Sequence, residues 1–117
     1  MRSRVIALNG LNVVESKQDY LEKLSRAISQ LHNCEAIHRE TVPVHEIFEG
    51  QTVWKGEVEV FELAGHPETK RAYGWSCRDG VNDETERYVT VLELPPVTSP
   101  LTAVRASIMA AAKKRRE

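Results

Sequence analysis

One stretch decides the fold: residues 53–94, VWKGEVEVFELAGHPETKRAYGWSCRDGVNDETERYVTVLEL. It holds three runs rich in β-branched and aromatic residues, separated by clusters of turn-forming residues. These runs cover residues 53–63, 71–77 and 87–94. Strands that follow one another through short polar loops pair most simply in antiparallel fashion. The sequence therefore predicts three adjacent antiparallel strands at the centre of the chain.

The alternation within two of the runs predicts which side chains share a face of the sheet. In the first run, Val58 and Val60 share a face with Trp54, whereas Phe61 and Leu63 lie on the other face. This change of apolar face predicts either a bulge or a strand end that is buried on both sides. One face of the second run is bulky and consists of Tyr73, Trp75 and Cys77. The opposite face is almost flat and consists of Ala72, Gly74 and Ser76.

A helical pattern lies on each side of this stretch. The first is predicted over residues 17–32, with Ser16 as N-cap and Asn33 in the left-handed conformation that ends a helix. The second begins at Ser99-Pro100, an N-cap followed by proline at the first helical position. Each helix has one apolar stripe at helical spacing: Tyr20, Leu21, Leu24, Ala27, Ile28 and Leu31 in the first, and Leu101, Val104, Ile108 and Ala111 in the second.

The remaining segments leave alternatives open. Residues 36–44 fit an edge strand and not a central one, because Pro43 lacks a backbone donor. Residues 1–14 form an N-terminal extension that is either a small hairpin around Asn9-Gly10 or a flexible segment. The prediction is thus a single α+β domain over residues 15–117, with the order helix, three-stranded antiparallel sheet, helix (α-β-β-β-α), and an extra edge strand before the sheet as an option.

Composition places the chain in an ordinary globular class. Of its 117 residues, 41% are hydrophobic and 28% charged, which is enough to bury a core and too apolar for wholesale disorder. Two cysteines, Cys34 and Cys77, are too few for a disulfide scaffold, so we expect reduced thiols and a cytoplasmic location. No apolar run is long enough to span a bilayer, and the start of the chain lacks the pattern of a secretory signal.

The net charge of −1 hides an uneven distribution. Residues 35–66 carry seven acidic and two basic side chains, whereas residues 99–117 carry five basic and one acidic. Such a contrast predicts either two contact surfaces of opposite sign, including head-to-tail self-association, or simply two solvated faces. The second of these segments contains a candidate basic patch, Lys113, Lys114, Arg115 and Arg116.

Candidate chemistry is sparse. His32, Cys34, His38 and His45 are ligand types that zinc accepts, but their spacing matches no zinc motif. A nucleophilic cysteine would need a histidine oriented by a carboxylate, for which Cys34 with His38 or His45 and Cys77 with His66 and Asp79 are the cysteine-based options. The six glycines are scattered and open neither helix, which excludes a phosphate-binding loop of the glycine-rich kind. We therefore expect no metal, no cofactor and, on balance, no enzyme.

The order helix, three strands, helix resembles double-stranded-RNA-binding domains, which read duplex shape through phosphate and 2′-hydroxyl contacts. Those domains carry lysines at the start of their second helix. Here the corresponding residues 99–105 contain one basic side chain, Arg105, and the basic cluster lies at the opposite end of the helix. The resemblance covers about 80 residues as a topology and implies nucleic-acid binding only as an alternative function.

Four aromatic residues of the predicted strands form a candidate interaction surface: Trp54, Tyr73, Trp75 and Tyr88. Aromatic side chains that face away from the helices would offer a partner an anchoring patch, whereas those that face the helices would belong to the core. With no assembled catalytic motif, the leading hypothesis is a noncatalytic protein-interaction or homodimerising module. The partner would be a protein or a second copy, and no membrane is expected.

Overall fold

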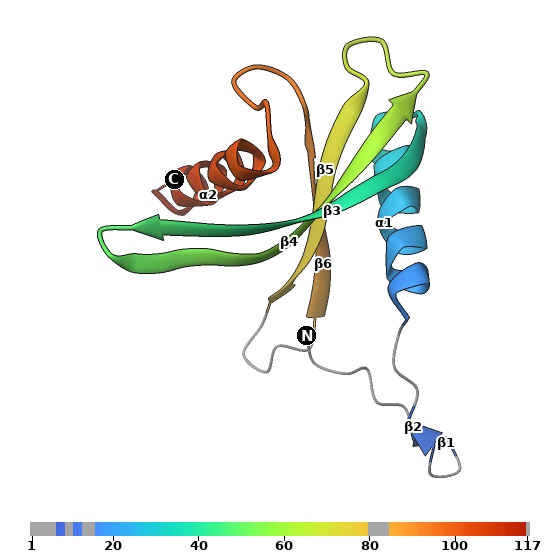
Figure 1. The fold of residues 1–117 in the computed structure, drawn as a ribbon, viewed down its shortest axis with the longest axis horizontal. Helices are drawn as coiled ribbons and strands as arrows, with labels where there is room; N and C mark the ends of the chain where they lie inside the picture. Colours follow the sequence, from blue (N-terminus) through green and yellow to red (C-terminus); the bar gives the residue numbers. More distant parts are fainter. Residues whose placement is uncertain (1–6, 9–10, 13–15, 80–84, 117) are drawn as a thin grey trace.

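The protein is described from a computed structural model that covers residues 7–8, 11–12, 16–79 and 85–116, with side chains described for 16–77 and 87–113. A domain of two helices and four strands follows a short N-terminal hairpin (Figure 1). The elements are β1 (Ala7–Leu8), β2 (Leu11–Asn12), α1 (Lys17–His32), β3 (Glu35–Phe48), β4 (Gln51–Ala64), β5 (Arg71–Asp79), β6 (Thr85–Leu92) and α2 (Pro100–Arg116). The predicted α+β class is confirmed, with a four-stranded sheet (α-β-β-β-β-α).

The extra edge strand and the small hairpin are both present. β3 to β6 form one antiparallel sheet in the order β3-β4-β5-β6, so β3 lies at one edge and β6 at the other. β1 and β2 pair antiparallel in a separate sheet. The other residues of the predicted extension, 1–6, 9–10 and 13–14, lie outside the described part of the chain.

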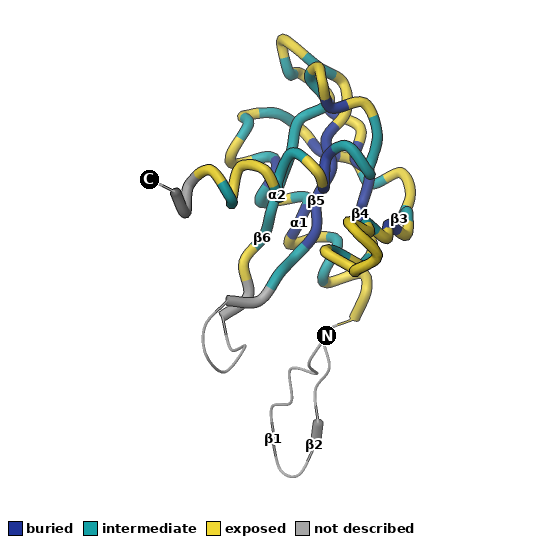
Figure 2. Tube along the Cα trace, turned by 90° about the vertical axis from the view of Figure 1, so that its left-hand side faces the viewer, coloured by how far each residue is buried: buried dark blue, intermediate teal, exposed yellow. Residues whose placement is uncertain are grey.

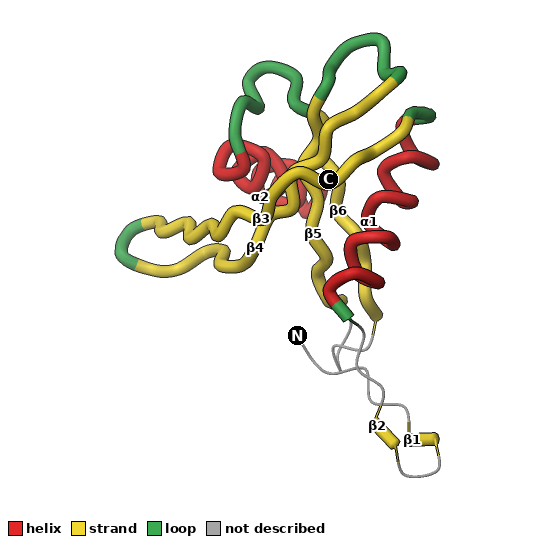
Figure 3. Tube along the Cα trace, turned by 45° about the vertical axis from the view of Figure 1, so that its right-hand side comes forward, coloured by secondary structure: helices red, strands yellow, loops and turns green. Residues whose placement is uncertain are grey.

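The two helices cover opposite faces of the sheet (Figures 1 and 3). This arrangement explains the change of apolar face in β4, because Val58 and Val60 pack in the core beneath α2 whereas Phe61 and Leu63 pack beneath α1. The strand end is therefore buried on both sides, as one of the two sequence alternatives stated. One bulge lies in the neighbouring strand, where Arg39 is the extra residue between His38 and Glu40. A second register shift lies farther from the change of face, where Val53 of β4 is the extra residue between Thr52 and Trp54.

The flat face of β5 is what lets α1 approach closely. Ala72 is fully buried there, and a Cβ added at Gly74 would lie 3.2 Å from Leu24 and 3.6 Å from Ile28 of the helix. The backbone N–H of Ser76 donates to the Tyr20 hydroxyl at 3.1 Å. Small side chains on the strand thus leave room for the apolar stripe of α1.

Both helices begin as the sequence predicts. The Ser16 hydroxyl accepts a hydrogen bond from Asp19 N–H at 3.1 Å, and Asn33 ends α1 with φ of 53°. α2 starts at Pro100, and Ala103 N–H donates to Ser99 C=O at 2.9 Å. The apolar stripe of α2 meets the sheet in the first half of the helix, where Val104 and its neighbour Ala103 are fully buried, whereas Ala111, also predicted in the stripe, is exposed.

Beyond β5, the β3–β4 hairpin continues alone. β4 pairs with β5 only over Glu59–Glu62, whereas it pairs with β3 along almost its whole length. The free part, which we call the hairpin arm (residues 44–56), projects well past the rest of the sheet (Figures 1 and 3). Glu49 and Gly50 both have positive φ at its tip, the combination that a two-residue hairpin turn of type I′ requires.

Candidate functional site

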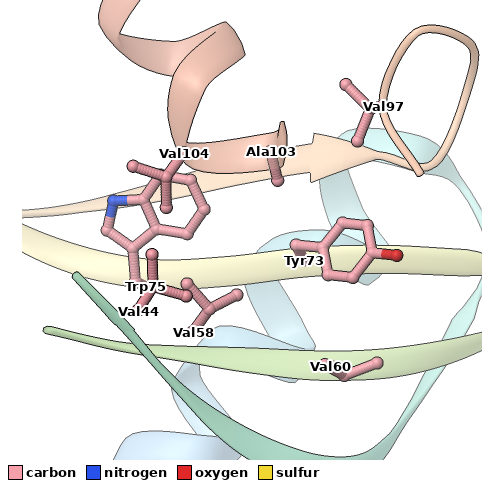
Figure 4. Packing of buried hydrophobic residues seen from close by; sticks show 8 residues of the cluster. All are labelled: Val44, Val58, Val60, Tyr73, Trp75, Val97, Ala103 and Val104. Atoms are coloured by element: carbon pink, nitrogen blue, oxygen red, sulfur yellow. The ribbon is translucent and has the colours of Figure 1, made fainter. Parts of the chain in front are cut away.

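The four aromatic candidates do not form one exposed surface. Tyr73 and Trp75 are only 1% and 2% exposed and lie in the core beneath α2, where Val104 and Ala103 pack over them (Figure 4). Their positions on the bulky face of β5 place them there, because α2 covers that face. The predicted interaction surface is corrected accordingly: these two side chains belong to the core and are not accessible to a partner.

The other two aromatic candidates are half-buried on opposite faces. Trp54 meets Trp75 edge-to-face at a centroid distance of 5.6 Å, on the side covered by α2. Tyr88 packs against the core beneath α1. Each is thus a boundary residue of a different core, and no single partner surface joins them.

Exposed apolar side chains gather instead at the tip of the hairpin arm. Phe48 is 64% and Ile47 55% exposed, and Val53 on the paired strand β4 is also exposed. Sequence reasoning left this part of the chain ambiguous. The signal was nevertheless present, since the apolar pair lies directly before Glu49-Gly50, a turn dipeptide between two β-rich runs.

A buried carboxylate forms the main polar cluster. Glu59 is 1% exposed and faces the α1 side of the sheet. It accepts hydrogen bonds from Lys17 Nζ at 2.6 Å, Thr41 Oγ1 at 2.5 Å and His38 Nε2 at 2.8 Å. Lys17 belongs to α1 and the other two donors to β3, so Glu59 fastens both elements to β4.

The electrostatics of this cluster stabilise the ion pair. Burial alone would raise the pKa of the Glu59 carboxyl, but the hydrogen bonds from Lys17, Thr41 and His38 outweigh it and hold the pKa below its usual value. Burial alone would lower the pKa of Lys17, but its hydrogen bond and attraction to Glu59 raise it. Both shifts favour the charged forms, so the cluster is a satisfied ion pair and not a poised general acid.

A shallow cavity of about 420 Å³ lies beside the cluster, between α1 and β3. Its lining is mostly polar: Gln18, Leu21, Glu22, Ser25, Arg26 and His38. Ser25 Oγ donates to the Ala36 carbonyl at 2.7 Å and closes one end of the contact between helix and strand. With one apolar side chain among six, this cavity has little of the hydrophobic lining that small-molecule sites usually show.

The candidate metal and nucleophile residues are placed apart. Within the described side chains, no group of three or more His, Cys, Asp or Glu converges as a metal site. His38 binds Glu59, and His45 Nε2 lies 2.6 Å from Thr52 Oγ1 on the arm. Cys34 is half-buried against the α1 core, and this burial raises the pKa of its thiol.

The two described members of the second cysteine group, Cys77 and His66, each bind other residues. Cys77 Sγ accepts from Arg87 Nη2 at 3.3 Å. His66 Nδ1 instead accepts the backbone N–H groups of Glu68 and Thr69 in the β4–β5 loop. Asp79, the proposed third member, lies outside the described side chains.

The basic candidates have a mixed outcome. Lys113 is exposed near the end of α2, whereas the side chains of 114–116 lie outside the described part. Arg105 Nε, near the start of the helix, donates to Glu46 Oε2 at 2.7 Å and so binds the hairpin arm. The fourth strand, β3, also separates this element order from that of double-stranded-RNA-binding domains.

Neither helix, as far as the chain is described, is long and apolar enough to cross a membrane. Comparison with protein-family models, with curated proteins and with solved structures gave no match to this chain.

Proposed function

We propose that this chain is a noncatalytic, cytoplasmic protein-interaction module that binds its partner with the tip of the hairpin arm. The observation that carries the proposal is the exposure of Ile47 and Phe48, at 55% and 64%, on a ribbon that projects beyond the sheet. Adjacent large apolar side chains at a protruding tip are a mark of an interaction site. The partner that fits this chemistry is a protein with an apolar cleft.

The arm is held in place before any partner arrives. Val44 at its base and Trp54 farther along pack into the core beneath α2, and Arg105 binds Glu46, which lies opposite Trp54 in the hairpin. The tight turn at Glu49-Gly50 fixes the tip. A preformed arm loses little conformational entropy on binding, which favours its use as a docking element.

The polar clusters support a noncatalytic role. Glu59 is occupied by three donors, and its low pKa suits an ion pair more than proton transfer. The raised pKa of Cys34 disfavours the thiolate that nucleophilic catalysis uses. These features are consistent with a structural role for Glu59 and Cys34.

The test compares Phe48→Ser with Leu31→Ser in the full chain. Leu31, predicted as part of the apolar stripe of α1, is 66% exposed at the end of the helix, so its substitution removes a similar exposed apolar side chain at a site away from the arm. Both variants should melt close to the wild type, because neither residue belongs to a core. Affinity purification with chemical cross-linking from the source cells should recover a stoichiometric partner with wild type and Leu31→Ser, and lose it with Phe48→Ser.

Equal recovery with both variants would show that the partner binds elsewhere. Recovery of no stoichiometric partner with the wild type would contradict the proposed function itself.

A further inference from the structure

The outer edge of β6 presents backbone groups to which no other strand in the described part of the chain is paired. Glu93 N–H donates to Arg71 C=O at 3.0 Å, so the backbone of Glu93 points toward β5. Backbone direction alternates along an antiparallel strand. Leu92, Thr90 and Tyr88 therefore direct their N–H and C=O groups away from β5, toward the open edge.

This edge lacks the features that usually prevent strand pairing. Residues 88–92, YVTVL, contain no charge and no proline, and the register with β5 runs without a bulge. Natural edge strands are commonly protected by such devices. The apolar side chains of this segment are half-buried on both faces of the sheet: Tyr88, Val89, Val91 and Leu92.

The segment is complementary to itself. When two copies of β6 lie antiparallel with Thr90 opposite Thr90, Tyr88 of one copy lies opposite Leu92 of the other. These residues point their backbones outward, so each such pair exchanges two hydrogen bonds. The Leu92 carbonyl already accepts from Leu94 N–H at 2.9 Å, and its second lone pair serves the new bond. Val89 lies opposite Val91 in the same register.

Charge complementarity selects this register over its neighbours. It places Arg87 of each copy opposite Glu93 of the other, in a pair whose side chains approach closely because the backbones are not bonded there. A shift by two residues in either direction would place Arg87 opposite Val91 or Pro95, and would lose both ion pairs. Arg87 is exposed, and the Glu93 side chain is 27% exposed.

Hydrogen bonds and an ion pair within the same chain already orient the side chains of Arg87 and Glu93. Arg87 Nη2 donates to Cys77 Sγ at 3.3 Å, and Glu93 accepts the Tyr73 hydroxyl and lies 3.7 Å from Arg71 Nη1. The remaining lone pairs of the carboxylate are available to a second guanidinium.

The end of α2 provides a second, independent observation. Figure 2 shows the C-terminal end of this helix extending past β6, beyond the edge of the sheet. Met109 on this half of the helix is 70% exposed, and Ala110 and Ala111 are also exposed. A sheet continued by a second copy would lie beneath this end and cover it.

We propose that β6 is a homodimerisation edge, where a second copy of this chain pairs antiparallel across a two-fold axis at Thr90 and joins the two four-stranded sheets into one continuous sheet. The surface is separate from the hairpin arm, so the proposal goes beyond the protein-interaction role and stands or fails independently of it.

The first test is a charge reversal measured by analytical ultracentrifugation of the full chain. Arg87→Glu places two carboxylates opposite each other at both ends of the seam, and Glu93→Lys places two cations there. Each variant alone should raise the dimer dissociation constant about tenfold or more, the effect of roughly 1.4 kcal/mol. An equimolar mixture of the two variants should recover dimer, because a mixed seam pairs a carboxylate with a cation at both of its ends. Lys55→Glu, an exposed reversal on the arm, should leave the dimer unchanged.

The second test does not depend on charge and covers the case in which Glu93→Lys fails to fold. Thr90→Cys should form a disulfide-linked dimer on mild oxidation, because directly bonded strand partners have Cα atoms about 5.5 Å apart, within disulfide range. Thr52→Cys on the arm is the matched control and should not cross-link. A wild type that stays monomeric at its highest soluble concentration would overturn the proposal. So would a dimer that Arg87→Glu leaves intact and Thr90→Cys fails to cross-link.

Discussion

The two edges of the sheet are built in opposite ways. β3 carries a bulge at Arg39, a proline at position 43 and charged residues around them, whereas residues 88–92 of β6 carry none of these. An open edge is a template for pairing with another chain, and proteins usually protect it. Protection of one edge and not the other indicates that the two edges have different roles, and that β6 is the one suited to pairing.

The protection of β3 can be followed atom by atom. Leu63 N–H donates to Lys70 C=O at 2.8 Å, so the backbone of Leu63 points toward β5, and the direction alternates along β4 from there. Glu57 consequently points the same way, and its partner Pro43 points outward. The missing donor of Pro43 therefore costs no bond within the sheet and denies one to any strand that approaches from outside. Near the other end of β3, the Ala36 carbonyl is occupied by Ser25.

The largest expected loss of stability is at Phe61, which anchors the protected edge strand β3 to the core. Phe61 is fully buried beneath α1 and meets His38 of β3 edge-to-face at 5.4 Å. Phe61→Ala should lower the free energy of unfolding by about 3–5 kcal/mol, through lost burial and a cavity. Leu92→Ala at the half-buried β6 edge should cost less, about 1–2 kcal/mol, since it loses less buried area. Urea denaturation measures both, and equal losses would contradict the contrast between the edges.

A smaller effect is expected at the centre of the sheet, where α1 rests on β5. Gly74→Ala would place a Cβ 3.2 Å from Leu24, a contact that the helix must relieve by shifting. We expect a loss of about 1–3 kcal/mol in unfolding free energy, the usual range for overpacking. Ser76→Ala, on the same face, retains the backbone N–H that binds Tyr20 and loses only the Ser76 hydroxyl bond to that side chain, so it should cost less, about 0.5–1 kcal/mol. A Gly74→Ala protein as stable as the wild type would show that α1 packs less closely than described.

Acid should affect the two sheet edges differently, because the buried carboxylate of Glu59 binds side chains of β3. Glu59→Gln weakens bonds to Lys17 and His38 and should destabilise by about 1–2 kcal/mol at neutral pH. Because the folded-state pKa of Glu59 is depressed, its contribution is complete above the usual carboxyl pKa and is lost as pH falls through the lower folded value. The difference between variant and wild type, measured by urea denaturation at several pH values, should therefore shrink in acid.

Hydrogen exchange provides the spatial readout for this pH effect. Glu59 fastens His38 and Thr41, so lowering the pH should reduce the protection of amides on β3, measured relative to their intrinsic exchange rates at each pH, before it does so on β6. An equal or larger loss of protection on β6 at the same pH would mean that Glu59 does not act on the protected edge in particular.

The helices and strands were predictable because capping residues and hydrophobic periodicity are local patterns in the sequence. The Ser16 and Asn33 caps bound α1 at the residues predicted, and Ser99-Pro100 begins α2. The flat face of β5 was also predictable from the sequence, since Ala72, Gly74 and Ser76 alternate with bulky residues. These features depend on near neighbours in the chain, which sequence periodicity reports directly.

The layer arrangement and the surface were not predictable in the same way. Whether Trp75 is core or surface depends on which face α2 covers, and that is set by packing between distant segments. The length of β3 was hidden because its alternation reverses at the Arg39 bulge. The degree to which Ile47 and Phe48 are exposed follows from how little of β4 pairs with β5, a tertiary property that the local turn signal does not report.

The smallest change in stability is expected for Pro43→Thr, which tests the contrast between the two sheet edges most directly. Pro43→Thr gives β3 an outward N–H and a residue suited to strands, while the bonds to β4 stay as they are. The free energy of unfolding should change by less than about 0.5 kcal/mol, as for a surface site. Association through β3 should nevertheless increase, because the edge has lost a device that blocks pairing. Light scattering against concentration measures this, with Pro67→Thr in the exposed β4–β5 loop as the matched control. If Pro43→Thr and Pro67→Thr associate no more than the wild type, the bulge and charges of β3 protect the edge without the proline.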